Sequence, residues 1–409
     1  MDAPDHRRLG RQLEIFATEE QCGAGLPFWL PAGAIVRSEL EAFVTELERR
    51  HGYRHVNTPV MAKRELYERS GHWEHYHADM YPPMEVGAEQ LVLRPMLCPH
   101  HILIFDQQPR SWRELPLRLG EVGPMFRRER SGVVGGLSRV RQSTLNDGHV
   151  FCPEDRVTGE IIDILSMIEI AYRALRIPAP RLRLSRGGSG PKYVSDPAIW
   201  QRSEAMLRDA LDRAGATYAE AENEAAFYGP KIDLQVSDPQ GREETLSTIQ
   251  VDLVLPSRFG LHYDRNGERR SPIMIHRSII GTLERMTAHL LEVHNGALPV
   301  WLSPTQALVM AATESSRTYA AAVNRRLLSS GLRAELDDRD ATLGARIRTA
   351  YPRKIPYVVV VGEREQRDQT ISLRLRDGGQ QQSLTIDRLI EMARCAGRPN
   401  RAGASGTVR

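Results

Sequence analysis

The stretch EVGPMFRRERSGVVGGLSRVRQSTLNDGHVFC, residues 121–152, is the most informative part of this chain. It reads as two strands, because a Gly-rich turn separates Phe126 to Glu129 from a return segment that begins at Arg139. Side chains two residues apart lie on one face of a strand. The residues expected on one face are Arg139, Arg141, Ser143, Leu145, Asp147 and His149. Such a hairpin could hold a nucleotide and a metal ion side by side.

The composition describes a folded, soluble protein of more than one domain. The chain has 409 residues, of which 41% are hydrophobic, and this is ample for real cores. No apolar run approaches the roughly 20 residues of a membrane span, and the polar start MDAPDHRRLGRQLEIF is no secretory signal. We therefore expect a cytoplasmic protein. Its 4 scattered cysteines are too few for a disulfide framework, so a special cysteine should be a ligand or a nucleophile.

The order of the expected elements changes near residue 300. Before it, consecutive strands with short turns favour an antiparallel sheet flanked by helices, an α+β fold. After it, strands and helices alternate, which predicts a smaller α/β domain. The expected limits are 1–299 and 300–396, and the Gly-, Arg- and Ser-rich residues 397–409 should be disordered.

Several segments together point to one family. The three signatures of class II aminoacyl-tRNA synthetases stand as Pro59 after a helix-strand unit, Phe126 to Glu129, and Gly281 to Arg285. Further segments are RPMLCPHH (94–101), NDGHVFC (146–152), AFYGPKIDL (226–234), IQVDLVLPSRF (249–259) and IMIHRSIIGTLER (273–285). In order and spacing, almost the whole chain resembles the threonyl-tRNA synthetases. The resemblance implies a catalytic domain over 1–299, an anticodon-binding-like domain over 300–396, and a homodimer formed through residues 34–60.

The resemblance also implies one zinc ion per subunit. Its three expected ligands are Cys98, His149 and His276. Three protein ligands leave a position open, which suits a catalytic or substrate-binding zinc. In the family the amino group and β-hydroxyl of threonine bind the ion, so valine is rejected strongly and serine only weakly. The residues implied to hold the amine and hydroxyl are Asp147, Tyr228 and Gln250.

Adenylate formation sets the requirements for the ATP end of the site. A carboxylate attacks the α-phosphorus, and the transition state needs fixed positive charge and Mg²⁺ more than a proton-transfer residue. By resemblance, Arg127 bridges the carboxylate and the α-phosphate, and Arg127 and Arg285 are the catalytic pair. The residues implied to contact ATP are Arg127, Glu129, Arg139, Thr248 and Arg285.

Three positions depart from the family pattern. Ser143 stands where a phenylalanine stacks on adenine, and the missing stack is worth about 1 to 3 kcal/mol. Leu145 and Thr245 each replace a glutamine near the substrates. These changes predict altered ATP binding and a member of the family that is not a routine housekeeping copy.

The C-terminal domain is expected to bind tRNA. By resemblance, Arg348, Glu365 and Arg374 contact anticodon bases. Asp340 replaces an asparagine, and its negative charge should weaken the contact with RNA. The sequence begins almost at the catalytic core, so we expect no editing in cis and measurable serine misacylation.

Other functions remain open beside a threonine-tRNA ligase. An inhibitor-tolerant duplicate would charge tRNA with a changed pocket. A paralogue in specialised metabolism would activate threonine or a related β-hydroxy amino acid for an acceptor other than tRNA. A non-catalytic regulatory paralogue is favoured by Ser143 and Leu145 but opposed by the complete set of arginines and metal ligands.

Overall fold

The computed structural model describes residues 3–188, 190 and 193–397 and divides into two compact units. Residues 18–26 and 44–286 form one unit, and residues 1–17, 27–43 and 287–409 form the other. Within the described ranges, no helix is both long and apolar enough to cross a membrane. The limits 1–299 and 300–396 stay predictions. Beyond Gly397, the segment expected to be disordered lies outside the described residues.

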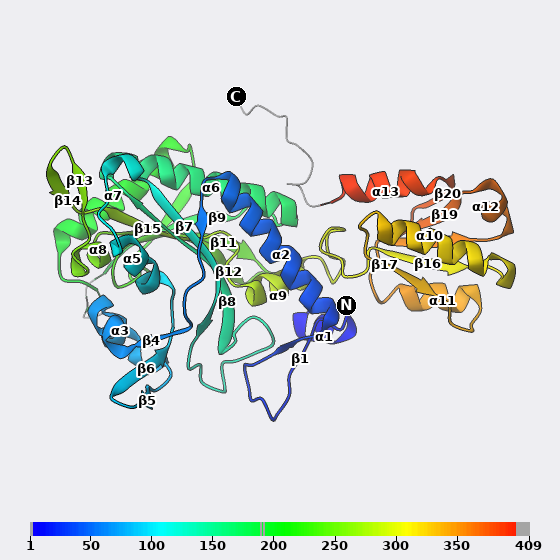
Figure 1. Ribbon diagram of the computed structural model, residues 1–409, viewed down its shortest axis with the longest axis horizontal. Helices are drawn as coiled ribbons and strands as arrows, with labels where there is room; N and C mark the ends of the chain where they lie inside the picture. Colours follow the sequence, from blue (N-terminus) through cyan, green and yellow to red (C-terminus); the bar gives the residue numbers. More distant parts are fainter. Residues whose placement is uncertain (1–2, 189, 191–192, 398–409) are drawn as a thin grey trace. The chain divides into compact units, whose positions relative to one another are not determined.

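An eight-stranded sheet forms the centre of the first unit (Figure 1). Its order is β10 (Tyr218–Ala221), β9 (Arg181–Ser185), β11 (Lys231–Ser237), β12 (Glu243–Asp252), β15 (Ile273–Ser278), β8 (Gln142–Cys152), β7 (Leu117–Phe126) and β3 (Arg54–His55). All inner pairs are antiparallel, and only the two outermost pairs are parallel. The predicted α+β fold with an antiparallel sheet is therefore confirmed.

Helices cover both faces of this sheet. The helix α5 (Cys98–Asp106) packs Ile102 and Phe105 against Phe151 of β8 in one hydrophobic cluster. On the other face, the hydroxyl of Tyr172 in α6 (Val157–Leu175) lies 2.8 Å from Oγ of Ser247 in β12. Further helices of this unit are α3 (Arg64–Ser70), α4 (His72–Tyr76), α7 (Pro197–Arg213) and α8 (Val254–Arg258).

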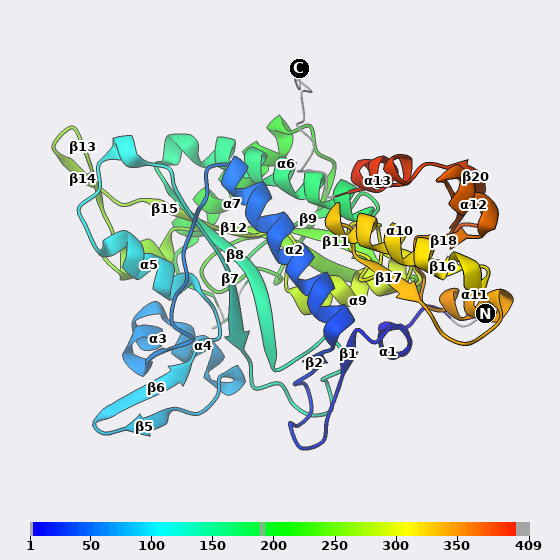
Figure 2. The same cartoon turned by 45° about the vertical axis from the view of Figure 1, so that its right-hand side comes forward.

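The segment after the helix α2 (Pro31–Arg50) contains less strand than its sequence suggests. Within residues 53–60 only β3 forms, and Pro59 near the end of this segment has no N–H to donate to a neighbouring strand. A small three-stranded sheet follows, with order β4 (Met61–Lys63), β6 (Glu89–Leu93) and β5 (Met84–Val86) (Figure 2). A separate hairpin joins β13 (Tyr263–Arg265) and β14 (Glu268–Arg270).

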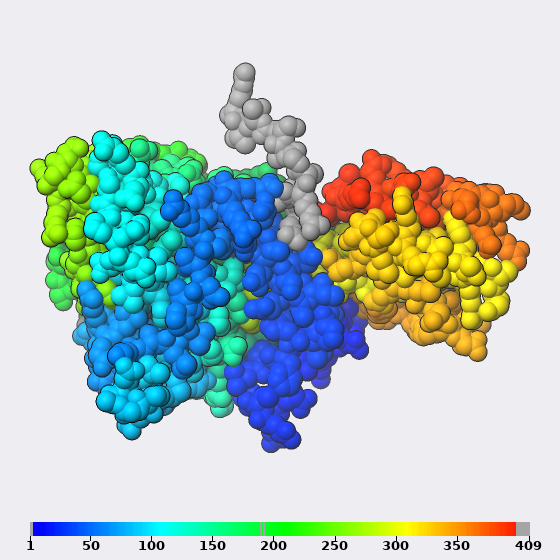
Figure 3. All heavy atoms as spheres, in the orientation of Figure 1, coloured from blue at the N-terminus to red at the C-terminus, as the bar shows by residue number. Residues whose placement is uncertain are grey.

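The second unit contains a five-stranded sheet between helices. Its order is β17 (Ala334–Asp337), β16 (Ala307–Ala311), β18 (Tyr357–Val361), β19 (Ile371–Leu375) and β20 (Gln380–Leu384). Val309 of β16 packs with α10 (Arg317–Ser329) and α13 (Ile386–Cys395), whereas Leu308 and Met310 pack with α11 (Leu343–Ala350). This alternation follows from the two-residue period of a strand. The helices α10 and α13 lie side by side on the visible face of the unit (Figure 3).

The remaining elements complete the two units. They are α1 (His6–Gln12), β1 (Phe16–Ala17), β2 (Phe28–Trp29), α9 (Leu283–Val293) and α12 (Glu363–Asp368). In the second unit the rings of Phe43 and Trp301 lie 5.2 Å apart, so the segment 27–43 shares the core of that unit.

Candidate active site and metal centre

A cavity of 390 Å³ in the first unit is lined by the residues that the sequence analysis predicted to bind substrates and metal. Its lining includes every residue predicted to bind the metal, ATP or the amino acid: Cys98, Arg127, Glu129, Arg139, Asp147, His149, Tyr228, Thr248, Gln250, His276 and Arg285. The volume lies within the usual range for small-molecule sites, about 300 to 1,000 Å³. These residues are distant in the sequence, and the sheet brings them together.

The register of three neighbouring strands builds the metal end of the cavity. Gln250 of β12 pairs with His276 of β15, and His276 pairs with His149 of β8. Paired residues on adjacent strands direct their side chains to the same face, so the three form a row. Asp147 lies two residues before His149 and shares that face.

Cys98, His149 and His276 meet at one point. All three are buried, and their candidate ligand atoms lie within 4.8 Å of one another. Cys98 is the first residue of α5, and this helix packs against the face of β8 that carries His149. One sulfur and two imidazole nitrogens are a typical donor set for zinc.

The electrostatics of these residues fit a bound cation. Burial, with the carboxylates of Asp147 and Asp252, raises the pKa of the Cys98 thiol well above its usual value. Burial holds the pKa of His149 well below its usual value, so its ring is neutral. Nε2 of His149 is buried without a hydrogen-bond partner among the described residues. A metal ion would supply that partner and would stabilise a thiolate at Cys98.

Asp252 holds the second histidine, and the sequence did not indicate this role. Its Oδ2 lies 2.9 Å from Nε2 of His276, while its Oδ1 accepts hydrogen bonds from the N–H groups of Val254 and Leu255 at the start of α8. Metal-bound histidines commonly donate their other N–H to a carboxylate in this way. Asp252 was missed because only the folded structure brings it next to His276.

A polar group of side chains lies beside the metal end. The hydroxyl of Tyr228 donates to Oε1 of Gln250 at 2.7 Å, and the Tyr228 ring stacks on His276 with centroids 4.7 Å apart. Asp147 accepts from the N–H of Gly148 at 3.0 Å, and burial raises its pKa. Oxygen acceptors and a hydroxyl are thus placed where an amine and an alcohol could bind.

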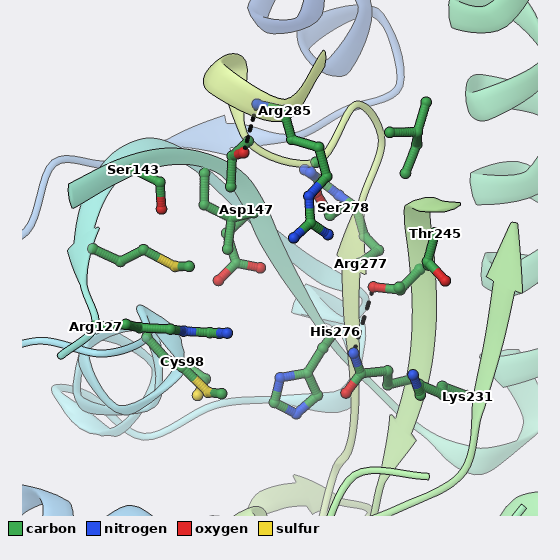
Figure 4. A pocket seen from close by; sticks show the side chains of 18 of the residues that line it. Cys98, Arg127, Ser143, Asp147, Lys231, Thr245, His276, Arg277, Ser278 and Arg285 are labelled. Carbon is green, nitrogen blue, oxygen red and sulfur yellow. Dashed lines mark hydrogen bonds between the residues drawn. The ribbon is translucent and has the colours of Figure 1, made fainter. Parts of the chain in front are cut away.

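Arginines line a further part of the cavity. Figure 4 shows Arg285 away from Cys98 and His276, whereas Arg127 is drawn just above Cys98 and points towards the middle of the cavity. The side chain of Arg127 has no ion pair or hydrogen bond with any described residue. The enclosure of Arg285, together with the nearby charges of Arg127 and Arg139, lowers its pKa. The positive charge of Arg127, which no described carboxylate pairs, favours an anionic ligand.

Two predicted ATP contacts bind each other in this structure. Nη2 of Arg139 lies 2.8 Å from Oε2 of Glu129. Thr248 accepts from Nε2 of Gln250 at 3.4 Å, between the two ends of the cavity.

A glycine turn positions Arg285. Gly281 has φ +63°, and a Cβ there would lie 2.6 Å from the carbonyl oxygen of Leu246, so the turn requires glycine. Glu284, one residue before Arg285, accepts from the N–H of Thr144 in β8 at 2.8 Å. These contacts fix the start of α9 against the strand that carries the metal ligands.

The prediction that alternate residues from Arg139 to His149 lie on one face of a strand is partly wrong. β8 begins at Gln142, so Arg141 precedes the strand and does not line the cavity. Its Nε donates to the carbonyl oxygen of Glu129 at 3.0 Å and its Nη2 to Ser131 at 3.1 Å. Arg141 therefore holds the loop between the two strands.

The cavity wall includes all three positions that were expected to differ from the family pattern: Ser143, Leu145 and Thr245. Ser143 pairs in register with Met125 of β7, which also lines the cavity. Thr245 accepts from Nε2 of Gln235 at 2.6 Å. Small or aliphatic side chains thus form this part of the wall.

His72 is a further histidine at the site that the sequence did not single out. It is fully buried in α4, its Nε2 lies 3.5 Å from Sγ of Cys98, and its Nδ1 lies 2.7 Å from Oγ of Ser70. Burial lowers the pKa of His72 to about 3. A lone buried histidine on a short helix carries no spacing signal, so only the structure places it here.

The residues predicted to read an anticodon lie in the second unit. Arg348 of α11 and Arg374 of β19 are exposed. Glu365 accepts from the N–H of Gly362 at 2.9 Å and from Oγ of Ser372 at 2.8 Å, which stabilises the start of α12. Burial opposes its ionisation, but these donors lower its pKa. The two arginines are available to RNA, whereas Glu365 already has structural partners.

Comparison with known proteins gives the family of this chain. A family model of the tRNA synthetase class II core domain (G, H, P, S and T) matches residues 83–294, and a model of the anticodon binding domain matches residues 306–396. The chain belongs to the class II tRNA synthetases. Its resemblance to the threonyl enzymes of this family is confirmed by the relatives below.

Two bacterial relatives and one solved structure illustrate the similarity. The threonine-tRNA ligase of Enterococcus faecalis is 47% identical over 90% of this chain, and threonine-tRNA ligase 1 of Bacillus subtilis is 44% identical over 95%. The chain spans 58% and 61% of the length of these relatives. The crystal structure of the RNA binding domain of threonyl-tRNA synthetase from Cryptosporidium parvum Iowa II has a TM-score of 0.91 at 36% identity, covering 97% of this chain and 99% of that one.

Proposed function

We propose that this class II synthetase activates L-threonine with ATP, releases pyrophosphate, and transfers the threonyl group to tRNA(Thr). The observation that carries the proposal is that one cavity contains both candidate metal ligands and candidate phosphate-binding arginines. The same cavity is lined by a buried Cys-His-His cluster and by three arginines, Arg127, Arg139 and Arg285. We infer the amino acid, threonine, and the acceptor, tRNA, from the names of the relatives.

Cys98, His149 and His276 would hold one zinc ion. The assignment is supported by the buried Nε2 of His149, which has no hydrogen-bond partner among the described residues, and by the set of sulfur and imidazole donors. When bound, zinc supplies a Lewis acid that can bind an amino group and a hydroxyl group together. Tyr228, Gln250 and Asp147 would then orient the same two groups by hydrogen bonds.

The arginines would act on the phosphates. A threonine carboxylate oxygen forms a bond to the α-phosphorus, and the bond from that phosphorus to the pyrophosphate oxygen breaks. Arg127 would bind the carboxylate and the α-phosphate, because its guanidinium is free of partners among the described residues and offers bidentate donors. Arg139 and Arg285 would stabilise the leaving pyrophosphate, whose further charge Mg²⁺ arriving with ATP would neutralise.

In the second step of the proposed reaction, the threonyl group passes from the adenylate to tRNA. A ribose hydroxyl at the 3′ end of tRNA would attack the carbonyl carbon of the adenylate and release AMP. The anticodon binding domain at residues 306–396 supports tRNA over a small amine or a carrier protein as that acceptor. We further propose that the protein acts as a cytoplasmic homodimer.

Charging of tRNA tests this function. The zinc-loaded chain is incubated with ATP, labelled threonine and a transcript of tRNA(Thr), with an alanine tRNA transcript as the control. We expect threonine-dependent charging of the first transcript only. Exchange of pyrophosphate into ATP without charging would instead favour an acceptor other than tRNA, and absence of both would favour a regulatory paralogue.

A further inference from the structure

A line of buried side chains extends from the metal ligand His149 away from the cavity. Nδ1 of His149 lies 2.8 Å from Nδ1 of His101, and the two rings are perpendicular. Nε2 of His101 lies 3.3 Å from Oε2 of Glu121 in β7. His101 and Glu121 are buried and do not line the cavity, so neither can touch a substrate there.

Glu121 is held firmly as a carboxylate. It accepts from the hydroxyl of Thr58 at 2.7 Å, from the N–H of Thr58 at 3.2 Å, and from Nη2 of Arg94 at 3.0 Å. Arg94 is itself fixed, because its Nε donates to the carbonyl oxygen of Pro124 at 2.6 Å. A charge-paired carboxylate with these partners can only accept hydrogen bonds.

The direction of each hydrogen bond then follows from donor and acceptor chemistry. Because Glu121 only accepts, Nε2 of His101 must carry the hydrogen. In a neutral imidazole the other nitrogen is then an acceptor, so Nδ1 of His101 must accept from Nδ1–H of His149. Nε2 of His149 is left with a free lone pair, and it is the ring nitrogen that has no hydrogen-bond partner among the described residues, since Oδ1 of Asp147 lies 3.8 Å away.

We infer that Glu121 and His101 are positioning residues that fix His149 in the tautomer presenting Nε2 to the metal ion. This inference rests on the zinc binding in the proposed function and deepens it by naming the residues that set the tautomer. The two histidine ligands are held differently. Asp252 contacts His276 directly at 2.9 Å, whereas Glu121 acts on His149 through the ring of His101.

Metal affinity tests the inference without recourse to activity. The full chain and its variants are stripped of metal, titrated with Zn²⁺ against a chromophoric chelator, and loaded with Co²⁺ to record the visible spectrum. His101→Leu removes the acceptor and should weaken zinc binding about 10- to 100-fold. His101→Asn keeps an amide oxygen near the position of Nδ1 and should retain most of the affinity. His100→Leu is the matched control, because His100 is a buried neighbour in α5 whose ring nitrogens have no hydrogen-bond partner within the described part of the chain.

The outcomes separate this inference from the proposed function. A parent chain that binds no zinc would contradict the zinc assignment itself. A parent chain that binds zinc, with folded His101→Leu as tight as His100→Leu, would overturn the positioning role alone. Two-bond ¹⁵N–¹H correlations of ring-labelled histidines in the zinc-loaded parent require no variant. They should show His101 protonated at Nε2, and protonation at Nδ1 would overturn the inference even where His101→Leu does not fold.

Discussion

Arg127 is the side chain on which the proposed chemistry depends most. It lines the cavity with no partner among the described residues, in a segment whose next residue, Arg128, is exposed and outside the cavity. A charge placed where the transition state develops negative charge acts mainly on the rate of the chemical step.

Arg127→Ala should lower kcat for threonine-dependent pyrophosphate exchange about 10²- to 10³-fold. Arg128→Ala is the matched control, since it removes the same charge one residue away, and it should stay within about twofold. Steady-state exchange kinetics on both variants measure the difference. Equal rates in the two variants would show that Arg127 is only a solvated charge.

Ser143 should determine how well the site holds adenine. It faces Met125 across the β7–β8 pair at the cavity wall, where a ring could stack on a base. Ser143→Phe should lower the KM for ATP about tenfold, within the 1 to 3 kcal/mol of a base-aromatic stack. Ser143→Ala, which adds no ring, should leave that KM unchanged. An unchanged KM in the phenylalanine variant would mean that the nucleotide lies elsewhere in the cavity.

Individual residues divide into those that the sequence could reveal and those that it could not. The flanking segments that resemble threonyl-tRNA synthetases predicted three metal ligands, Cys98, His149 and His276. These three residues lie together in the structure. His72 and Asp252 act through contacts that no local pattern encodes. The ion pair between Arg139 and Glu129 could not be foreseen either, because both were assigned to a nucleotide.

At the scale of elements, long strands and helices are the parts that a sequence pattern predicts best. The limits 117–126 for β7 and 157–175 for α6 coincide with their patterns of buried residues. Short elements such as β3 and α8 are harder to bound from the sequence, because contacts with distant residues decide them. The register that aligns Gln250, His276 and His149 is likewise a property of the assembled sheet.

The buried ion pair of Arg94 and Glu121 should make the first unit sensitive to acid. Burial opposes ionisation, but His101, Thr58 and Arg94 together lower the pKa of Glu121 from 4.5 to about 2. Because the folded pKa lies below the unfolded one, this carboxylate stabilises the fold above pH 4.5, and that contribution disappears as the pH falls towards 2.

Glu121→Gln should therefore reduce the free energy of unfolding by about 3 kcal/mol at pH 7, and by much less at pH 3. Denaturant unfolding at the two pH values measures this. Glu169→Gln breaks an exposed pair with Arg173 in α6 and serves as the control, with no change expected at either pH. A loss that is equal at pH 3 and pH 7 would contradict the assigned ionisation.

At the scale of the whole molecule, the second unit should govern the choice and strength of tRNA binding. Asp340 is exposed and places a negative charge before α11, which carries Arg348. Asp340→Asn should lower the KM for tRNA several-fold at low salt, with a smaller effect at high salt, because phosphate contacts are electrostatic. Threonine-dependent pyrophosphate exchange should not change. An unaltered KM for tRNA at all salt concentrations would place Asp340 away from the RNA.

The central claim is that one cavity joins a zinc-dependent amino-acid site to an arginine-lined ATP site. Pyrophosphate exchange by the zinc-loaded chain with threonine, serine and valine tests this most directly. Zinc chemistry predicts strong exchange with threonine, weaker but measurable exchange with serine, and almost none with valine, which has no hydroxyl. Removal of zinc should abolish the preference for threonine over valine. Exchange with valine equal to that with threonine, or no exchange with any of the three, would contradict the account.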